Sequence, residues 1–92
     1  MFVYILTNKI KSTLYIGVTN DLQRRLFEHK NGIGSFNSFT SKYKCFYLVH
    51  FEEFGTPKEA IVREKELKKW RREKKNQLIE IENPNWDFLE ID

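Results

Sequence analysis

Hydrophobic and polar positions along the chain follow the periods of short strands and amphipathic helices. Two runs rich in β-branched and aromatic residues, at positions 2–8 and 12–19, are separated only by a short polar link. Runs of this kind so close together predict a β-hairpin. A third run, at positions 43–54, alternates with both faces largely apolar, and we interpret it as the central strand of a small sheet.

Two further segments carry helix start signals and helical spacing of their apolar residues. The first begins after residues 19–20, whose threonine and asparagine are both suitable N-caps, and ends at the Asn-Gly pair 31–32. The second begins with Thr56 as the N-cap and Pro57 at the first helical position. We expect this second helix to run to about Trp70.

The order of these elements predicts an α+β fold. We expect residues 71–83 either to continue the second helix or to bend into a further helix. The predicted order of elements is therefore β-β-α-β-α, with a last helix in the second case. This order favours a three-stranded, mostly antiparallel sheet flanked by helices. Residues 32–42 predict an exposed loop, and the aromatic tail at 86–89 is expected to pack back onto the body. At 92 residues, we expect a single domain over positions 1–92.

Composition narrows the class of protein. The apolar content of 40% suits a folded globular chain and argues against disorder. The single Cys45 excludes an internal disulfide and a thiolate zinc site. No apolar run approaches the roughly 20 residues that span a bilayer, and the N-terminus lacks the basic region of a signal peptide. We therefore expect a cytoplasmic protein with no membrane partner.

The net charge of +3 is unevenly distributed. Residues 61–76 carry eight basic and three acidic side chains, whereas residues 77–92 carry five acidic side chains and no basic one. This asymmetry predicts one cationic surface rather than a uniformly basic protein. Taken alone, a basic helical run is more often a solvated face than a nucleic-acid contact.

The first helix places two basic residues beside its apolar stripe. At about 100° per residue, Leu22 and Leu26 form the stripe, and Arg25 and His29 border it on the side turned toward the sheet. Arg24 points away. Basic side chains at the edge of a buried face need partners there. For His29, a structural role near the C-terminal end of the helix dipole is an alternative.

The second helix places a carboxylate among its apolar residues. Glu64 falls within the apolar arc around Ala60, where a lone carboxylate is costly unless it is paired, protonated or bound to a metal. One interpretation is a structural ion pair between Glu64 and Arg25. The other adds Tyr4 and Tyr15 from the hairpin to form a phosphodiester site. There the carboxylate holds a hard divalent ion, the arginine stabilises phosphate charge, and a tyrosine or histidine moves a proton.

Four stretches of the chain resemble the motifs of a known family. VYIL at 3–6 and LYIG at 14–17, followed by DLQRRLFEH and EAIVREKELKKW, are similar to the GIY-YIG nuclease superfamily, and especially to its small single-domain group described as UPF0213. The resemblance covers nearly the whole chain, although the first motif lacks the glycine of GIY. It implies a metal-dependent endonuclease that hydrolyses DNA phosphodiester bonds with one Mg²⁺ or Mn²⁺ ion. It also implies work in DNA repair or in the processing of foreign DNA.

The resemblance implies five catalytic positions. Tyr4 corresponds to the tyrosine of the first motif, and Tyr15 to that of the second, which activates or orients water. Arg25 stabilises charge on the phosphate and the transition state. His29 takes part in proton transfer or orients the site, and Glu64 is the ligand of the metal ion.

The implied partner is DNA, held through its phosphate backbone rather than read by sequence. The expected DNA-binding residues are Lys42, Lys65, Lys68, Lys69, Arg71, Arg72 and Lys75. Several superfamily nucleases carry a late asparagine, for which the candidates here are Asn76, Asn83 and Asn85. A partner protein that supplies substrate specificity is also expected. The alternative function is a nucleic-acid-binding module of the same fold with little or no catalytic turnover.

Overall fold

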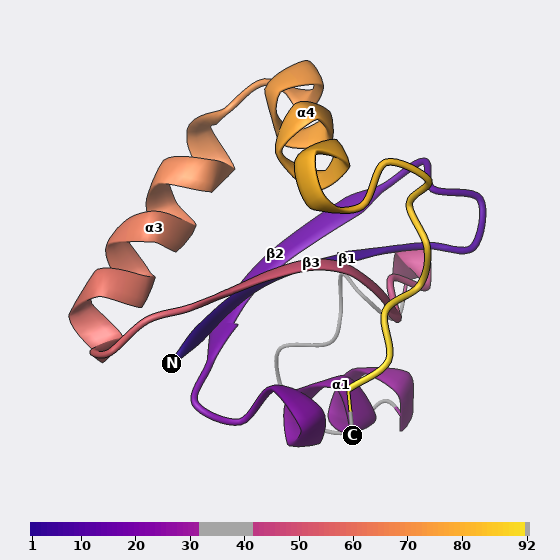
Figure 1. Ribbon diagram of the computed structural model, residues 1–92. Helices are drawn as coiled ribbons and strands as arrows, with labels where there is room; N and C mark the ends of the chain where they lie inside the picture. The colour runs from indigo at the N-terminus through magenta and orange to yellow at the C-terminus, as the bar shows by residue number, and fades with distance from the viewer. Residues whose placement is uncertain (32–41, 92) are drawn as a thin grey trace.

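The structure, a computed structural model, describes residues 1–31 and 42–91 and confirms the α+β class (Figure 1). Its elements in chain order are β1 (Phe2–Thr7), β2 (Leu14–Thr19), α1 (Leu22–Asn31), β3 (Tyr47–Glu53), α3 (Pro57–Lys69) and α4 (Arg72–Glu82). The three strands form one antiparallel sheet in the order β2-β1-β3. As Figure 1 shows, α3 and α4 cover one face of this sheet and α1 covers the other.

The predicted hairpin is confirmed, and its turn is held by an asparagine. The Oδ1 atom of Asn8 accepts hydrogen bonds from the backbone N–H groups of Ser12 (2.8 Å) and Thr13 (3.2 Å). Lys11 adopts the left-handed conformation, with φ at 61°. The hairpin pairs Tyr4 of β1 with Gly17 of β2, and this pairing brings the two sequence motifs face to face.

The central strand is β1, so the expectation that residues 43–54 form the central strand is wrong. β3 lies at an edge of the sheet, and the C-terminal tail covers that edge. The Leu89 N–H donates to the Leu48 carbonyl at 2.8 Å, and the Asn83 amide nitrogen donates to the Val49 carbonyl at 3.0 Å. β3 has the apolar character of a central strand because both of its faces are buried: Val49 packs in the cluster under α3 and α4, and Leu48 packs in the cluster under α1.

A β-bulge also breaks the alternation expected over residues 43–54. The strand begins only at Tyr47, and its register against β1 shifts between Ile5 and Leu6, which face His50 and Leu48. Val49 is the extra residue and packs in the core beneath α3 and α4. Alternation read from the sequence assumes a continuous ladder, which a bulge interrupts.

The helix starts follow the predicted chemistry with one change. In α3 the Thr56 side chain accepts a hydrogen bond from the Glu59 N–H at 3.3 Å, as a cap should. In α1 the capping side chain is Asp21, whose Oδ1 atom accepts from the Arg24 N–H at 3.1 Å. Thr19 instead bonds to the backbone of Asp21. The further helix is confirmed as α4, which ends at Glu82 with Asn83 as its C-cap.

Two hydrophobic clusters fill the space on either side of the sheet. The cluster under α3 and α4 comprises Val3, Ile5, Ile16, Val49, Ala60, Leu67, Ile79 and Trp86. The cluster under α1 comprises Tyr4, Leu6, Leu22, Cys45 and Leu48. The tail packs back as predicted, since Trp86 is buried and the ring of Phe88 stacks on Tyr47. The expected loop at 32–42 lies outside the described residues except for Lys42, which is in a helical turn.

Candidate active site

Tyr4 and His29 form a buried pair between the sheet and α1. The Tyr4 hydroxyl and the His29 Nε2 atom are 2.9 Å apart, and both side chains are almost completely inaccessible to solvent. The helical angles therefore placed His29 correctly on the inward face of α1. This contact joins β1, which carries the first motif, to α1.

Gly17 leaves the space that the Tyr4 hydroxyl fills. A Cβ atom at this position would lie 2.5 Å from the Tyr4 oxygen and 3.1 Å from a ring carbon of Tyr15. The backbone φ of Gly17 is outside the left-handed range. The glycine is thus required by the close approach of the Tyr4 ring and not by backbone conformation. This contact follows from the register of the hairpin, which places Tyr4 directly opposite Gly17.

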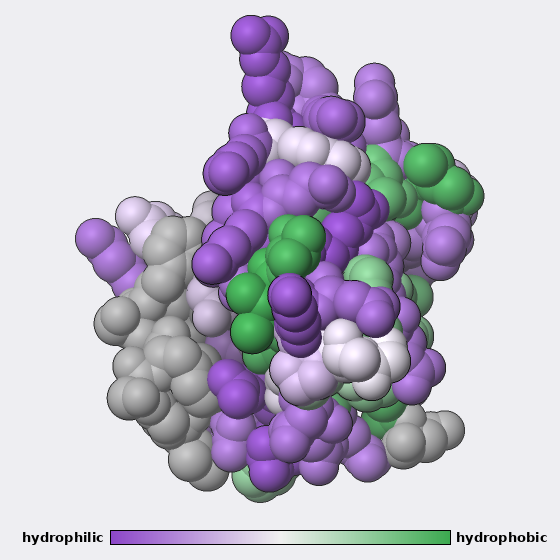
Figure 2. All heavy atoms as spheres, turned by 90° about the vertical axis from the view of Figure 1, so that its left-hand side faces the viewer, coloured by the Kyte–Doolittle hydropathy of each residue, from purple (hydrophilic) through white to green (hydrophobic). Residues whose placement is uncertain are grey.

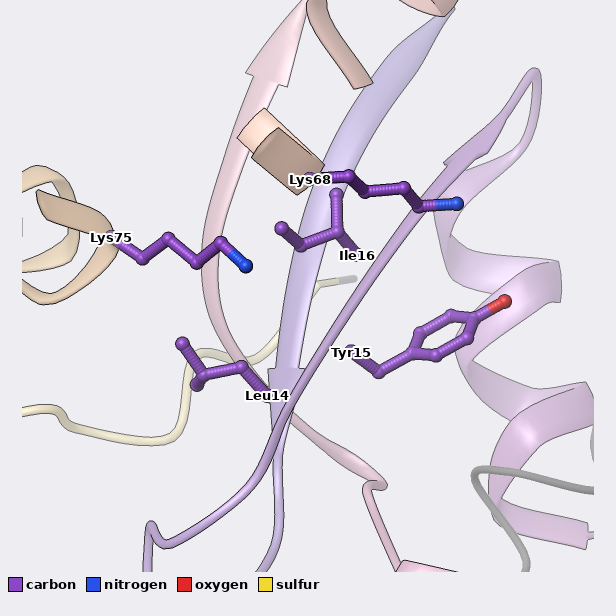
Figure 3. A pocket seen from close by; sticks show the side chains of 5 residues that line it. All are labelled: Leu14, Tyr15, Ile16, Lys68 and Lys75. Atoms are coloured by element: carbon purple, nitrogen blue, oxygen red, sulfur yellow. The ribbon is translucent and has the colours of Figure 1, made fainter. Parts of the chain in front are cut away.

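Tyr15 lies on the edge strand β2, half-buried, against this pair. Its ring centroid is 5.2 Å from that of His29 and 6.3 Å from that of Tyr4. It also lines a surface hollow of about 300 Å³ together with Leu14, Ile16, Lys68 and Lys75. Figure 3 shows the Tyr15 hydroxyl directed toward α1, with the Lys68 amino group reaching the same side of β2. The Tyr15 ring thus joins the buried pair to the surface.

Arg25 lies on the same side of α1 as His29. Its side chain is 24% exposed, against 53% for Arg24, so the helical angles distinguished the two arginines correctly. The Nε atom of Arg25 is 3.5 Å from a carboxylate oxygen of Glu28, one turn along the helix. Arg24, at the surface, donates to the Asn20 side chain and also lies 4.0 Å from the Glu28 carboxylate.

Glu64 on α3 is only 16% exposed and forms an ion pair with Lys68, whose Nζ atom is 3.2 Å from its carboxylate. Arg25 and Glu64 thus each form an ion pair with a neighbour on their own helix, Arg25 with Glu28 and Glu64 with Lys68. The structural alternative of a direct Arg25–Glu64 ion pair does not describe this arrangement.

The Tyr4 hydroxyl lies within electrostatic reach of the three other charged or hydroxyl-bearing candidates. Its pKa is raised, first because burial disfavours the phenolate. Tyr15 and Glu64 raise the pKa further, whereas the positive charge of Arg25 lowers it. Side chains from β2, α1 and α3 thus lie close enough to the Tyr4 hydroxyl to change its pKa, although of the five candidates only Tyr15 lines the hollow at the β2 edge.

Burial and charge also determine the protonation of His29. Its pKa is lowered to about 4, first by burial and then by the nearby charge of Arg25. The ring is therefore neutral at physiological pH, with one nitrogen as donor and the other as acceptor. Tyr4 and His29 are then a neutral hydrogen-bonded pair in which each ring fixes the orientation of the other.

The expected DNA-binding residues are distributed over several surfaces. Lys68 and Lys75 line the hollow beside Tyr15. Lys65 and Lys69 line a different hollow of about 470 Å³, together with Trp70. Figure 2 shows the side of the molecule on which α3 lies, and this face is largely hydrophilic with smaller hydrophobic patches.

The remaining three basic residues lie elsewhere. Arg71 is exposed at the start of α4, and the Lys42 ammonium lies over the Tyr43 ring. Arg72 donates to the backbone carbonyls of the hairpin turn, at Ser12 and Lys11. The run KKWRREKK is divided by the break between α3 and α4, so its side chains do not share one helix face.

Of the three late asparagines, Asn83 has a structural role. It is buried, its amide nitrogen donates to the carbonyls of Val49 and Asp87, and its Oδ1 atom accepts from the Asp87 N–H. Asn76 accepts a hydrogen bond from Arg72 and lines a hollow at the hairpin turn with Asn85. The sequence alone could not separate these positions.

The Glu64 carboxylate could supply one oxygen ligand to a divalent ion whose other ligands are waters and substrate phosphates. Within residues 1–31 and 42–91, no cluster of three or more His, Cys, Asp and Glu side chains is placed to enclose a metal. Mg²⁺ commonly keeps several waters and takes one or two carboxylates plus substrate phosphates. One partly buried carboxylate, such as that of Glu64, is compatible with that mode of binding.

Comparison with known proteins identifies the family. The sequence model of the GIY-YIG catalytic domain matches residues 1–77. The chain belongs to the GIY-YIG family. This membership supports a nuclease-like function and a nucleic-acid substrate for the GIY-YIG chain. In the described part of the chain, no helix is long and apolar enough to cross a membrane.

Relatives of this GIY-YIG chain carry the UPF0213 name. A UPF0213 protein of Haloquadratum walsbyi is 44% identical over 79 residues, which cover 86% of this chain and 85% of the relative. A UPF0213 protein of Clostridium perfringens is 44% identical over 78 residues, covering 85% and 81%. The solution NMR structure of a UPF0213 protein from Bacillus halodurans aligns with a TM-score of 0.58 at 34% identity, covering 92% of this chain and 87% of that one.

Proposed function

We propose that this GIY-YIG protein is a metal-dependent endonuclease that hydrolyses DNA phosphodiester bonds beside Tyr15. The observation that carries the proposal is the position of Tyr15 at the open edge of the sheet. Its ring lies against the buried Tyr4–His29 pair, and it lines a hollow with Lys68, the ion-pair partner of Glu64. Tyr15 and Lys68 line this hollow, and the ion pair with Lys68 connects it to Glu64.

The two tyrosines have different roles in this proposal. Tyr15, which is partly exposed, orients the attacking water and accepts a hydrogen bond from it. Tyr4 is a positioning residue, because it is fully buried and its hydroxyl is within hydrogen-bond distance of His29. The rings of Tyr4 and His29 pack against the Tyr15 ring and thereby fix the orientation of the Tyr15 hydroxyl.

Charge on the phosphate is balanced by residues of both helices. Arg25 places a permanently charged guanidinium near the site, which stabilises negative charge that develops on the phosphate. Glu64 would hold the divalent ion, which when bound supplies a Lewis acid for the phosphate oxygens. Lys68 holds the Glu64 carboxylate in place and adds positive charge beside the hollow.

A cleavage assay with matched variants tests the proposal. Branched, nicked and linear DNA are incubated with the protein and Mg²⁺ or Mn²⁺. We expect Tyr15→Phe and Glu64→Gln to lower the cleavage rate by about 100-fold or more. The controls are Tyr47→Phe, which keeps the stacked ring on β3, and Glu59→Gln at an exposed position of α3.

The outcomes separate the candidate functions. Loss of cleavage in the first two variants with full activity in the controls supports the endonuclease. Equal cleavage by all four variants would indicate a contaminating nuclease or a different site, and the assignment would be wrong. DNA binding by the wild type without cleavage of any substrate would instead support the binding module.

A further inference from the structure

A second hollow of about 310 Å³ lies at the turn of the β1–β2 hairpin, and none of the five candidate site residues lines it. It is lined by Lys11, Arg72, Asn76, Asn85 and Trp86. Lys11 and Asn85 come from a turn and the tail, whereas Arg72 and Asn76 come from the first part of α4. Three segments far apart in the sequence therefore build one concave surface.

The chemistry of this second hollow favours an anion. Its two charged lining residues are both basic, and none of the residues that line it is acidic. The Lys11 ammonium lies 5.3 Å from the centroid of the Phe88 ring, which keeps the cation at the surface beside the hollow. Trp86 donates its indole N–H to Glu80, so its ring provides an apolar wall.

Arg72 holds the second hollow in shape. Its guanidinium donates to the carbonyls of Ser12 at 2.9 Å and Lys11 at 3.0 Å, which ties α4 to the hairpin turn. Its Nε atom donates to the Oδ1 atom of Asn76 at 2.9 Å. Because the amide oxygen of Asn76 is used in this way, its NH₂ group is the part available to donate to a ligand. The donors are therefore oriented before any ligand arrives.

The second hollow lies near the one beside Tyr15, along the seam where α4 meets the hairpin. Lys75 lines the first hollow and the next residue, Asn76, lines the second. On the opposite wall, Leu14 lines the first and Lys11 the second. Three residues of extended chain span at most about 10 Å, so the two hollows are neighbours.

We infer that the second hollow binds a phosphate group of the same DNA strand whose scissile phosphate lies beside Tyr15. The strand would then follow the seam from Tyr15 past Lys75 toward the hairpin turn. Lys11 and Asn76 are the contacting residues, and Arg72 is a positioning residue. This inference rests on the proposed function, because it takes DNA as the ligand and Tyr15 as the centre.

The test measures binding of fluorescein-labelled DNA, as a duplex and as a single strand, by anisotropy over a series of salt concentrations. Lys11→Asn removes the charge but tolerates the left-handed backbone. It should reduce the slope of log affinity against log salt by about 0.9 for the duplex and 0.7 for the single strand. Asn76→Asp keeps an oxygen for Arg72 but adds a negative charge, and should weaken binding by about fivefold or more. Gln77→Glu makes the same change in charge at the adjacent exposed position of α4.

The outcomes also separate this inference from the proposed function. Weaker binding by Lys11→Asn and Asn76→Asp, with a smaller effect of Gln77→Glu, supports the second hollow as a phosphate site. If the wild type binds DNA with a steep salt dependence and all three variants match it, the inference is wrong while the proposed function stands. If the wild type shows no salt-dependent binding to either DNA, both are wrong.

Discussion

Substituting Gly17 tests whether the close packing around the Tyr4 hydroxyl holds the site together. In Gly17→Ala the new Cβ atom would lie 2.5 Å from the Tyr4 oxygen and 2.6 Å from the ring carbon that bears it. Tyr4 is fully buried and its hydroxyl is bonded to His29, so the ring has no free space to enter. Either the Tyr4–His29 pair separates or the hairpin strands move apart.

The expected cost follows from three contributions. Overpacking a buried site typically costs about 1–3 kcal/mol. Loss of the Tyr4–His29 hydrogen bond adds about 1 kcal/mol, whereas replacing glycine by alanine in a strand returns about 0.5–1 kcal/mol. The net effect is a loss of about 1–3 kcal/mol in the free energy of unfolding. For a domain of this size, that lowers the Tm by about 5–20 °C.

Thermal unfolding followed by circular dichroism measures this effect, with Gly55→Ala as the matched control. A Cβ atom at Gly55 would meet no atom within 4 Å, and the backbone there is not left-handed. Gly55→Ala should therefore leave the Tm unchanged or raise it slightly. If Gly17→Ala and Gly55→Ala melt at the same temperature, the close packing of Tyr4 against β2 is not what requires the glycine, and the reasoning fails.

Two further predictions concern a buried histidine and a buried asparagine. The pKa of His29 falls from 6.5 to about 4 on folding, so the unfolded chain binds more protons between these two pH values. The free energy of unfolding should therefore fall by up to about 3 kcal/mol as the pH drops from 6.5 to 4. His29→Gln should remove that part of the pH dependence in urea unfolding, and an unchanged pH profile would contradict the buried neutral ring. Asn83→Ala removes three hydrogen bonds and should cost about 2–3 kcal/mol of stability. Its cleavage rate per folded molecule should match the wild type, and a selective loss of rate would instead give Asn83 a catalytic role.

Local signals in the sequence were sufficient for the helices and for the inward faces of their side chains. The cap at Thr56 and the angles of Arg25 and His29 depend on residues within a few turns, and the structure agrees with both. The pairing of Tyr4 with His29 depends instead on how α1 packs on the sheet. The hydrophobic periodicity of a single segment does not predict this contact between two segments.

The errors arise where distant segments meet. Residues 43–54 have the composition of a central strand because helices and tail residues far away in the sequence bury both faces of β3. Alternation gave no warning of the bulge at Val49, since a bulge depends on the partner strand as well. Likewise, the sequence predicted one cationic surface around Trp70, but the break between α3 and α4 directs these basic side chains to different surfaces.

The tail that bonds to Leu48 and Val49 has a consequence for how the protein behaves at high concentration. An open strand edge presents unpaired N–H and C=O groups that can recruit a strand from another molecule. Here the Leu89 N–H and the Asn83 side chain occupy carbonyls on the outer edge of β3. By covering these groups, the tail prevents strands of other molecules from pairing with β3. The opposite edge, formed by β2, is the one that carries Tyr15.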